Sequence, residues 1–138
     1  MTEPLSDADA ALSANLEFYR AFNERSLKAM EALWASHAPV VCVHPGWTAI
    51  AGRSEVLQSW RAILANPDAP HVMCHNDRVF LYGEVAIVQC EEELETGHLV
   101  ATNTFIRENG AWKMIHHQAS PLVARGQEER RRPSPTRH

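Results

Sequence analysis

The second half of the chain alternates apolar and polar residues with a period of two, which is typical of β-strands with one buried face. Short turn sequences separate the alternating runs, at Gly83-Glu84, Thr96-Gly97 and Asn109-Gly110. Turns this short join antiparallel neighbours. The pattern therefore predicts a four-stranded antiparallel meander, with strands at 71–82, 85–95, 98–107 and 111–119.

The first half instead carries apolar residues at helical spacing in three segments, which begin near the potential capping residues Ser6, Ser26 and Ser54. The apolar side of the first segment comprises Leu12, Leu16, Tyr19 and Phe22. Short apolar runs at 40–44 and 48–50 predict one or two short strands before the third helix. The whole pattern predicts an α+β fold, with three N-terminal helices packed on one face of a curved antiparallel sheet.

A chain of 138 residues corresponds to one domain, which we assign to residues 1–124. The remaining segment, 125–138, contains five Arg, two Glu and almost no apolar side chain, so we expect it to be disordered. The body before it has eight Lys or Arg against fifteen Asp or Glu. This acidic balance argues against nucleic-acid binding by the folded domain.

No run approaches the roughly 18 apolar residues of a membrane span, and the N-terminus lacks the pattern of a signal peptide. The three cysteines, Cys42, Cys74 and Cys90, are widely spaced in apolar segments and indicate reduced thiols of a cytoplasmic protein. The eight histidines lack the spacings typical of metal sites. We therefore expect a cytoplasmic protein with no membrane contact, no metal and no cofactor.

Polar residues interrupt three of the apolar strands, at His44, Asn103 and His116. A buried polar side chain must be hydrogen-bonded, so such residues are either satisfied core groups or part of a pocket. Pairing around Asn109-Gly110 places Asn103 directly opposite His116, where the two form a joint amide–imidazole site or simply bond each other. A one-residue bulge would put His117 in that position instead.

His44 ends its strand just before Pro45 and is expected to be desolvated, which favours the neutral imidazole and a role as general base. The alternative is that His44 only anchors the end of the strand. The residues predicted to line a small apolar ligand pocket around these groups are Tyr19, Trp47, Trp60 and Gln118. For Tyr19 and Trp60 the alternative is an ordinary core position, as is usual for aromatic residues at helical spacing.

The order of elements and several motifs resemble the nuclear transport factor 2-like superfamily, in particular its SnoaL-like and ketosteroid-isomerase-like bacterial members. The most specific motifs are Val43-His-Pro-Gly-Trp47, Gly52-Arg53, Ser59-Trp60, Ala101-Thr-Asn103 and Trp112-Lys-Met-Ile-His-His-Gln-Ala-Ser120. The resemblance implies a cone-shaped, cystatin-like layout with a pocket between sheet and helices, and a homodimer.

The catalytic pattern of the ketosteroid isomerases differs at each position. The resemblance places His44 where those enzymes have a carboxylate base, and Phe18 where they have a tyrosine. Their protonated acid corresponds to Asn103, or to Thr104 if the register differs by one residue. The resemblance therefore does not extend to their mechanism.

Two functions fit the sequence. In the first, the protein is a cofactor-free isomerase or lyase/dehydratase acting on a compact carbonyl compound, with His44 as base and Asn103 and His116 orienting the substrate. In the second, it is a non-catalytic ligand-binding or assembly module resembling the association domain of the calcium/calmodulin-dependent protein kinase II. The outer sheet face predicted for assembly comprises Val88, Val100, Thr102 and Ile115.

Overall fold

The computed structural model describes residues 5–123, and the predicted tail at 125–138 lies outside this range. The elements are α1 (Asp7–Asn23), α2 (Leu27–Leu33), β1 (Val41–Val43), β2 (Ile50–Ala51), α3 (Arg53–Ala65), β3 (Met73–Tyr82), β4 (Val85–Leu94), β5 (Gly97–Glu108) and β6 (Ala111–Leu122). The six strands form one sheet in the order β2-β1-β6-β5-β4-β3, in which β1 runs parallel to β6 and the other neighbours are antiparallel.

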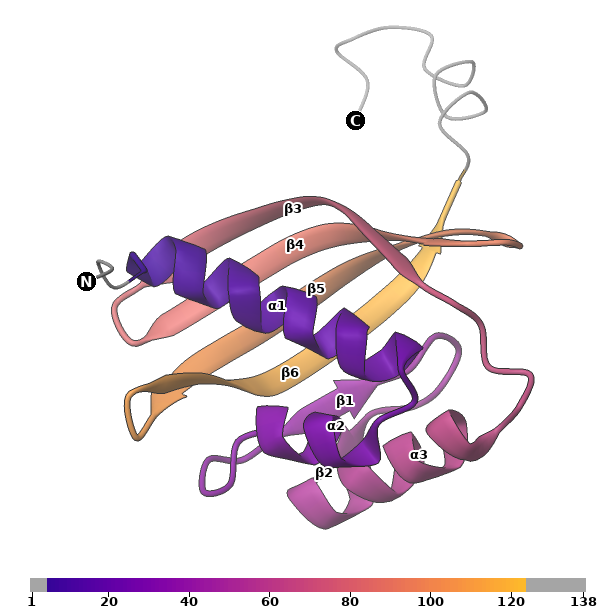
Figure 1. Ribbon diagram of the computed structural model, residues 1–138, viewed down its shortest axis with the longest axis horizontal. Coiled ribbons are helices and arrows are strands. Elements are labelled where there is room, and N and C mark those ends of the chain that lie inside the picture. The colour runs from indigo at the N-terminus through magenta and orange to yellow at the C-terminus, as the bar shows by residue number, and fades with distance from the viewer. Residues whose placement is uncertain (1–4, 124–138) are drawn as a thin grey trace, which may run out of the picture.

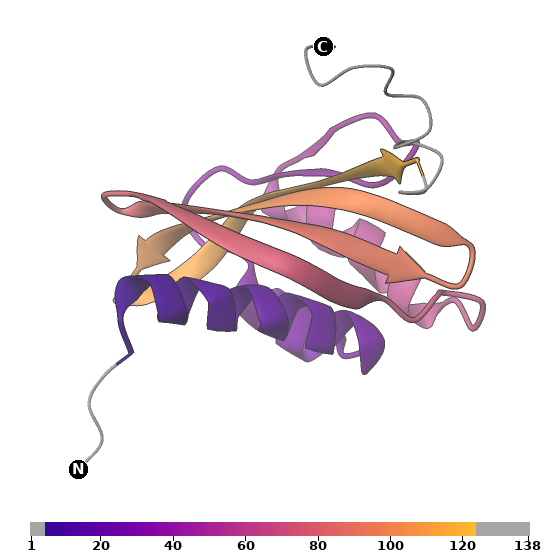
Figure 2. The same cartoon turned by 90° about the horizontal axis from the view of Figure 1, so that it is seen from above.

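The three helices lie on one face of this curved, unclosed sheet, which confirms the predicted α+β fold (Figures 1 and 2). Helix α1 crosses the long strands of the meander, whereas α2 and α3 lie beside the short strands β1 and β2. The hydrophobic core fills the space between helices and sheet. Its largest buried side chains include Phe18, Trp34, Trp60 and Phe105. One end of this space remains open as a cavity, described below.

The meander turns follow the sequence prediction. Asn109 and Gly110 have positive φ angles of 53° and 79°, as the tight β5–β6 turn requires. Beyond the turn, the predicted register holds as far as Phe105, which pairs with Met114. The partner of Thr104 is then His116, so Ile115 is an extra residue in β6 and forms a bulge.

This bulge corrects the predicted pairing of Asn103 with His116, because Asn103 lies opposite His117. Every side chain of β6 after the bulge changes face relative to the prediction. The inner face of β6 therefore carries Trp112 and Met114 before the bulge, and His117 and Ala119 after it.

Three further details differ from the sequence prediction. Leu16 was assigned to the buried side of α1 but is 53% exposed, and Asn15 is fully buried in that layer instead. Ser6 and Ser26 cap α1 and α2 as predicted, whereas α3 follows Gly52 and has no side-chain cap. Val88, predicted on the outer sheet face, is buried beneath the helices, because it is one of the alternate residues of β4 whose side chains point inward.

Glu108, at the end of β5, fastens the segment that leads into β1. Its two carboxylate oxygens accept hydrogen bonds from the backbone N–H groups of Ser36, His37 and Ala38, at 2.8, 2.9 and 3.0 Å. These three donors stabilise the charged form and lower the pKa of Glu108 to about 2. The carboxylate thus fixes the approach of the chain to the strand that ends at His44.

Candidate functional site

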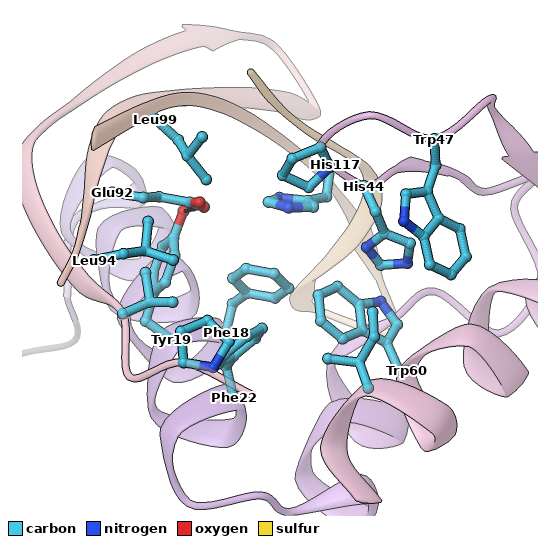
Figure 3. A pocket seen from close by; sticks show the side chains of 14 residues that line it. Phe18, Tyr19, Phe22, His44, Trp47, Trp60, Glu92, Leu94, Leu99 and His117 are labelled. Atoms are coloured by element: carbon cyan, nitrogen blue, oxygen red, sulfur yellow. Dashed lines mark hydrogen bonds between the residues drawn. The ribbon is translucent and has the colours of Figure 1, made fainter. Parts of the chain in front are cut away.

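A cavity of about 260 Å³ lies between α1, α3 and the inner face of the sheet. Its wall is mostly aromatic and aliphatic, with a few polar groups from β1, β4 and β6 (Figure 3). The lining residues are Phe18, Tyr19, Phe22, His44, Pro45, Trp47, Trp60, Ile63, Pro70, Val72, Glu92, Leu94, Leu99 and His117. An apolar cavity with few convergent polar groups is the usual form of a small-molecule site.

His44 follows the last residue of β1, and its imidazole lies between two indole rings, with centroids 4.7 Å from Trp60 and 4.9 Å from Trp47. Its Nε2 is 2.9 Å from Ser59 Oγ, and Ser59 donates its own hydroxyl proton to the Val56 carbonyl at 2.6 Å. Because that proton is used, Ser59 must accept from His44, and Nε2 carries the hydrogen.

The other nitrogen of His44, Nδ1, therefore keeps a lone pair. The Cys42 sulfur lies beside the ring, 3.9 Å from Nδ1 and 3.7 Å from Nε2. Burial lowers the pKa of His44 to about 4, since the charged imidazolium would lose its hydration. The ring is consequently neutral near pH 7 and is able to accept a proton or a hydrogen bond.

His117 projects from β6 beyond the bulge and is held by Asn103, whose Oδ1 lies 2.5 Å from His117 Nδ1. The Asn103 amide nitrogen donates to Asn15 Oδ1 at 2.7 Å and to Tyr19 Oη at 3.1 Å, which fixes the orientation of the amide. Asn103 Oδ1 therefore accepts from His117, and Nδ1 carries the hydrogen while Nε2 keeps a lone pair.

Burial is the largest of the causes that lower the pKa of His117 to about 3, and the charged forms of the nearby His44 and His116 contribute to the same shift. Its ring packs against Phe18, with centroids 4.7 Å apart and the two ring planes tilted by 42°. His44 and His117 are thus two neutral bases in one cavity, each fixed in one tautomer by a neighbouring side chain.

Glu92 supplies a buried carboxyl group that the sequence reasoning missed. It lies on the inner face of β4, and Tyr19 donates its hydroxyl hydrogen to Glu92 Oε2 at 2.6 Å. Burial raises the pKa of Glu92, an effect that this hydrogen bond only partly offsets. Burial and the charge of Glu92 also raise the pKa of Tyr19, so the phenol stays protonated. Figure 3 shows the Glu92 and His117 side chains pointing toward each other across the cavity.

The predicted site residues therefore have different positions. His44, Tyr19 and Trp60 line the cavity, as does Trp47, which is 51% exposed. Asn103 is fully buried behind His117 and does not line the wall. Two predicted residues lie away from the cavity because the bulge reverses their side chains: His116 is replaced by His117, and Gln118 is exposed.

Within residues 5–123, no group of three or more His, Cys, Asp or Glu side chains has the arrangement of a metal site. The three cysteines are free thiols. Two of them, Cys74 and Cys90, lie 3.6 and 4.0 Å from the amide nitrogen of Asn15 and support the network beneath Tyr19. No helix in this part of the chain is long and apolar enough to cross a membrane.

A curved, open sheet with helices on one face and a cavity beneath them defines the NTF2-like class of α+β proteins. The chain belongs to the SnoaL-like domain family, whose model matches residues 11–124.

Three relatives illustrate how varied proteins with this fold are. The chain is 31% identical over 116 residues to the F-box protein SKIP8 of Arabidopsis thaliana, covering 83% of this chain and about half (50%) of that protein. A candidate dehydratase of the NTF2-like family from Streptomyces avermitilis is 33% identical, with a TM-score of 0.79 and coverage of 86% and 97% of the two chains. A candidate calcium/calmodulin-dependent protein kinase type II association domain from Thiobacillus denitrificans is 29% identical, with a TM-score of 0.74 and coverage of 88% and 100%.

Proposed function

We propose that the protein is a cofactor-free isomerase or lyase/dehydratase that acts on a compact carbonyl compound by proton transfer. The observation that carries the proposal is the pair of neutral imidazoles, His44 and His117, each with one nitrogen held by a hydrogen bond and the other left with a lone pair. Groups with strongly shifted pKa values in a cavity are candidates for acid–base catalysis. The likeness to the candidate dehydratase from Streptomyces avermitilis also supports it.

The tautomers suggest separate roles. His44 is the general base, as the sequence predicted, and takes a proton from the carbon next to the substrate carbonyl. His117 takes the place predicted for His116, but its only ring N–H is bonded to Asn103. His117 therefore accepts a hydrogen bond from a substrate hydroxyl rather than stabilising an oxyanion, and Asn103 is a positioning residue.

Glu92 completes a dehydration step, because its raised pKa favours the acid form that can protonate a leaving group. His44 takes the proton, the C–O bond of the β-hydroxyl breaks, and Glu92 gives its proton to the leaving oxygen. Water departs, and transfer of a proton from the imidazolium to the carboxylate restores the starting state. In an isomerisation, His44 would instead return the proton to another carbon.

The test is hydrogen–deuterium exchange at the α-carbon of compact ketones in D₂O, followed by NMR with cyclohexanone, acetophenone and 4-phenylbutan-2-one. Exchange should exceed the buffer rate, and His44→Gln should reduce it by about 10²–10⁴-fold, the usual contribution of a general base. Glutamine keeps an N–H for Ser59, and His116→Asn is the matched control on the outer face. Exchange that never exceeds the buffer rate, or that survives His44→Gln, would refute the proposal.

A second candidate function is assembly, favoured by apolar side chains on the outer face of the sheet. Phe80 and Tyr82 on β3 are 37% and 62% exposed and flank Ile87 on β4. Such a face suits a sheet-to-sheet homodimer, and the likeness to the association domain from Thiobacillus denitrificans supports it. Sedimentation at micromolar concentration should give a dimer that Tyr82→Glu weakens, whereas a wild-type monomer would argue against assembly.

A further inference from the structure

We infer that the cavity selects an uncharged hydroxy-carbonyl compound and rejects the corresponding hydroxy acid. The inference rests on the proposed function and names the substrate class of the same site. It follows from the charges, the hydrogen-bonding capacity and the volume of the cavity.

Among the residues that the structure describes, no Lys or Arg side chain lines the cavity wall. The two arginines that are sequence neighbours of lining residues do not reach it. Arg20, next to Tyr19, pairs with Glu17 and Glu24 on the exposed side of α1. Arg61, next to Trp60, is exposed and lines a separate surface groove between α2 and α3. A ligand carboxylate in the cavity would therefore find no Lys or Arg partner among the described residues of the wall.

The remaining ionisable groups also disfavour a bound anion. His44 and His117 are neutral and, with their N–H groups used by Ser59 and Asn103, present only lone pairs. Glu92 is the one acidic residue among the described lining residues, and a second carboxylate beside it would further disfavour ionisation. Burying an unpaired charge is among the most unfavourable changes a cavity can accommodate.

The same polar groups specify what the ligand must offer. The lone pairs of His44 and His117 need a hydrogen-bond donor, such as a hydroxyl group. The acid form of Glu92, which burial favours, offers a hydrogen to an oxygen acceptor. The indole N–H of Trp60 is enclosed by the protein and lies against the Cys42 sulfur, so it is not available to a ligand. A neutral molecule with one hydroxyl and one carbonyl oxygen satisfies both requirements.

The volume limits the apolar part of the ligand. An engineered cavity of about 150 Å³ is known to bind benzene, so a cavity of about 260 Å³ accommodates a ring with a short side chain. The ring faces of Phe18, Phe22 and Trp60 would contact such a body. The class is therefore an uncharged β-hydroxy ketone, aldehyde or ester of roughly this size.

A matched pair of ligands tests the charge selection directly. The neutral probe is 4-hydroxy-4-phenylbutan-2-one, and the anionic probe is 3-hydroxy-3-phenylpropanoate, in which a carboxylate oxygen replaces the terminal methyl group. Binding is measured at pH 7.5 by quenching of tryptophan fluorescence and by calorimetry, and the ketone should bind at least about tenfold tighter than the propanoate.

Two variants locate the selection at Glu92. Glu92→Gln should raise the affinity for the propanoate. The ratio of the affinity for the ketone to the affinity for the propanoate should fall at least about threefold. Glu93→Gln is the matched control, because Glu93 is exposed and its side chain bonds His75, away from the cavity. The inference is overturned if the propanoate binds as tightly as the ketone, if neither compound binds, or if Glu92→Gln leaves the ratio of their affinities unchanged.

These results separate the inference from the proposed function. Selective binding of the ketone without α-proton exchange would retain the ligand class and refute catalysis. Exchange on the ketones, lost in His44→Gln, together with a propanoate that binds as tightly as 4-hydroxy-4-phenylbutan-2-one, would retain catalysis and refute the ligand class.

Discussion

Glu92 and Glu108 are carboxylates on adjacent strands of one sheet, and their surroundings shift their pKa values in opposite directions. Glu108 is only partly buried and accepts hydrogen bonds from three backbone N–H groups, which lower its pKa to about 2. Glu92 is buried against the cavity with the Tyr19 hydroxyl as donor, and burial raises its pKa. The first carboxylate is stabilised as an anion, and the second is biased toward the neutral acid.

The contrast separates groups that hold the fold together from groups that are available for chemistry. The donors and acceptors around Glu108 and Asn103 are matched within the protein. Those facing the cavity, namely Glu92, His44 and His117, keep lone pairs or a proton that a ligand can use. A hydrogen-bond inventory thus distinguishes anchoring residues from candidate catalytic residues where residue type alone does not.

The largest effect should come from breaking the matched network at Asn103. Asn103→Leu removes the acceptor of His117 Nδ1 and the donor to Asn15 Oδ1, both buried. Each orphaned buried group costs about 1–3 kcal/mol, so we expect a loss of roughly 2–5 kcal/mol in urea unfolding. Gln118→Leu, on the exposed face of β6, is the control and should change stability by less than about 1 kcal/mol. Equal losses in the two variants would contradict the network.

The next effect is the pH dependence that the cavity histidines impose. In the unfolded chain a histidine binds a proton below about pH 6.5, whereas His44 and His117 stay neutral down to about pH 4 and about pH 3. Between about pH 6.5 and 4.5 the unfolded state binds more protons, so the free energy of unfolding falls as the pH is lowered.

Each histidine should contribute on the order of 2 kcal/mol over that window. The measurement is unfolding at several pH values in wild type, His44→Gln and His117→Asn. Each variant should show a shallower fall than wild type, because it has lost one group that protonates only when unfolded. Unchanged slopes would show that the two rings are charged in the folded state.

The sequence predicted the fold well because its signals are local. Alternation along the strands, the Asn109-Gly110 turn and the caps at Ser6 and Ser26 each depend on a few neighbouring residues. The cavity positions of His44, Tyr19 and Trp60 follow from signals of the same kind: each is a polar or aromatic side chain at an apolar position of a regular element.

The missed residues depend on non-local or hidden features. The bulge at Ile115 cannot be recognised from the alternation of apolar and polar residues, since two consecutive histidines follow it and either can face inward. Glu92 stands between two other glutamates, and residue type alone does not distinguish it from them. The inward orientation of Glu92 could nevertheless have been predicted from the strand alternation. Ala86, Val88 and Cys90 are buried at every second position of β4, and Glu92 is the next position in that series.

The anchor at Glu108 should give a smaller and opposite pH effect. Its folded pKa lies below the unfolded value, so its contribution is present above about pH 4.5 and is lost as the pH falls toward 2. Glu108→Gln removes the charge and presents an amide N–H to backbone donors, so the Tm at pH 7 should drop by a few degrees. The difference from wild type should shrink as the pH is lowered, and a constant difference would contradict the assignment.

The smallest effect completes the comparison, because the same substitution at Glu92 should have the opposite sign. The folded carboxyl holds its proton at pH values where the unfolded one is ionised, so wild-type stability falls as the pH rises above about 4.5. A glutamine side chain at this position would be neutral throughout and would still accept from Tyr19, so Glu92→Gln should gain a few tenths to about 1 kcal/mol by pH 7. The measurement is the difference in unfolding free energy between variant and wild type at pH 4.5 and pH 7. A variant that loses stability as the pH rises would mean that the protein stabilises Glu92 as an anion, in the same way as Glu108, and that it is not the acid of the cavity.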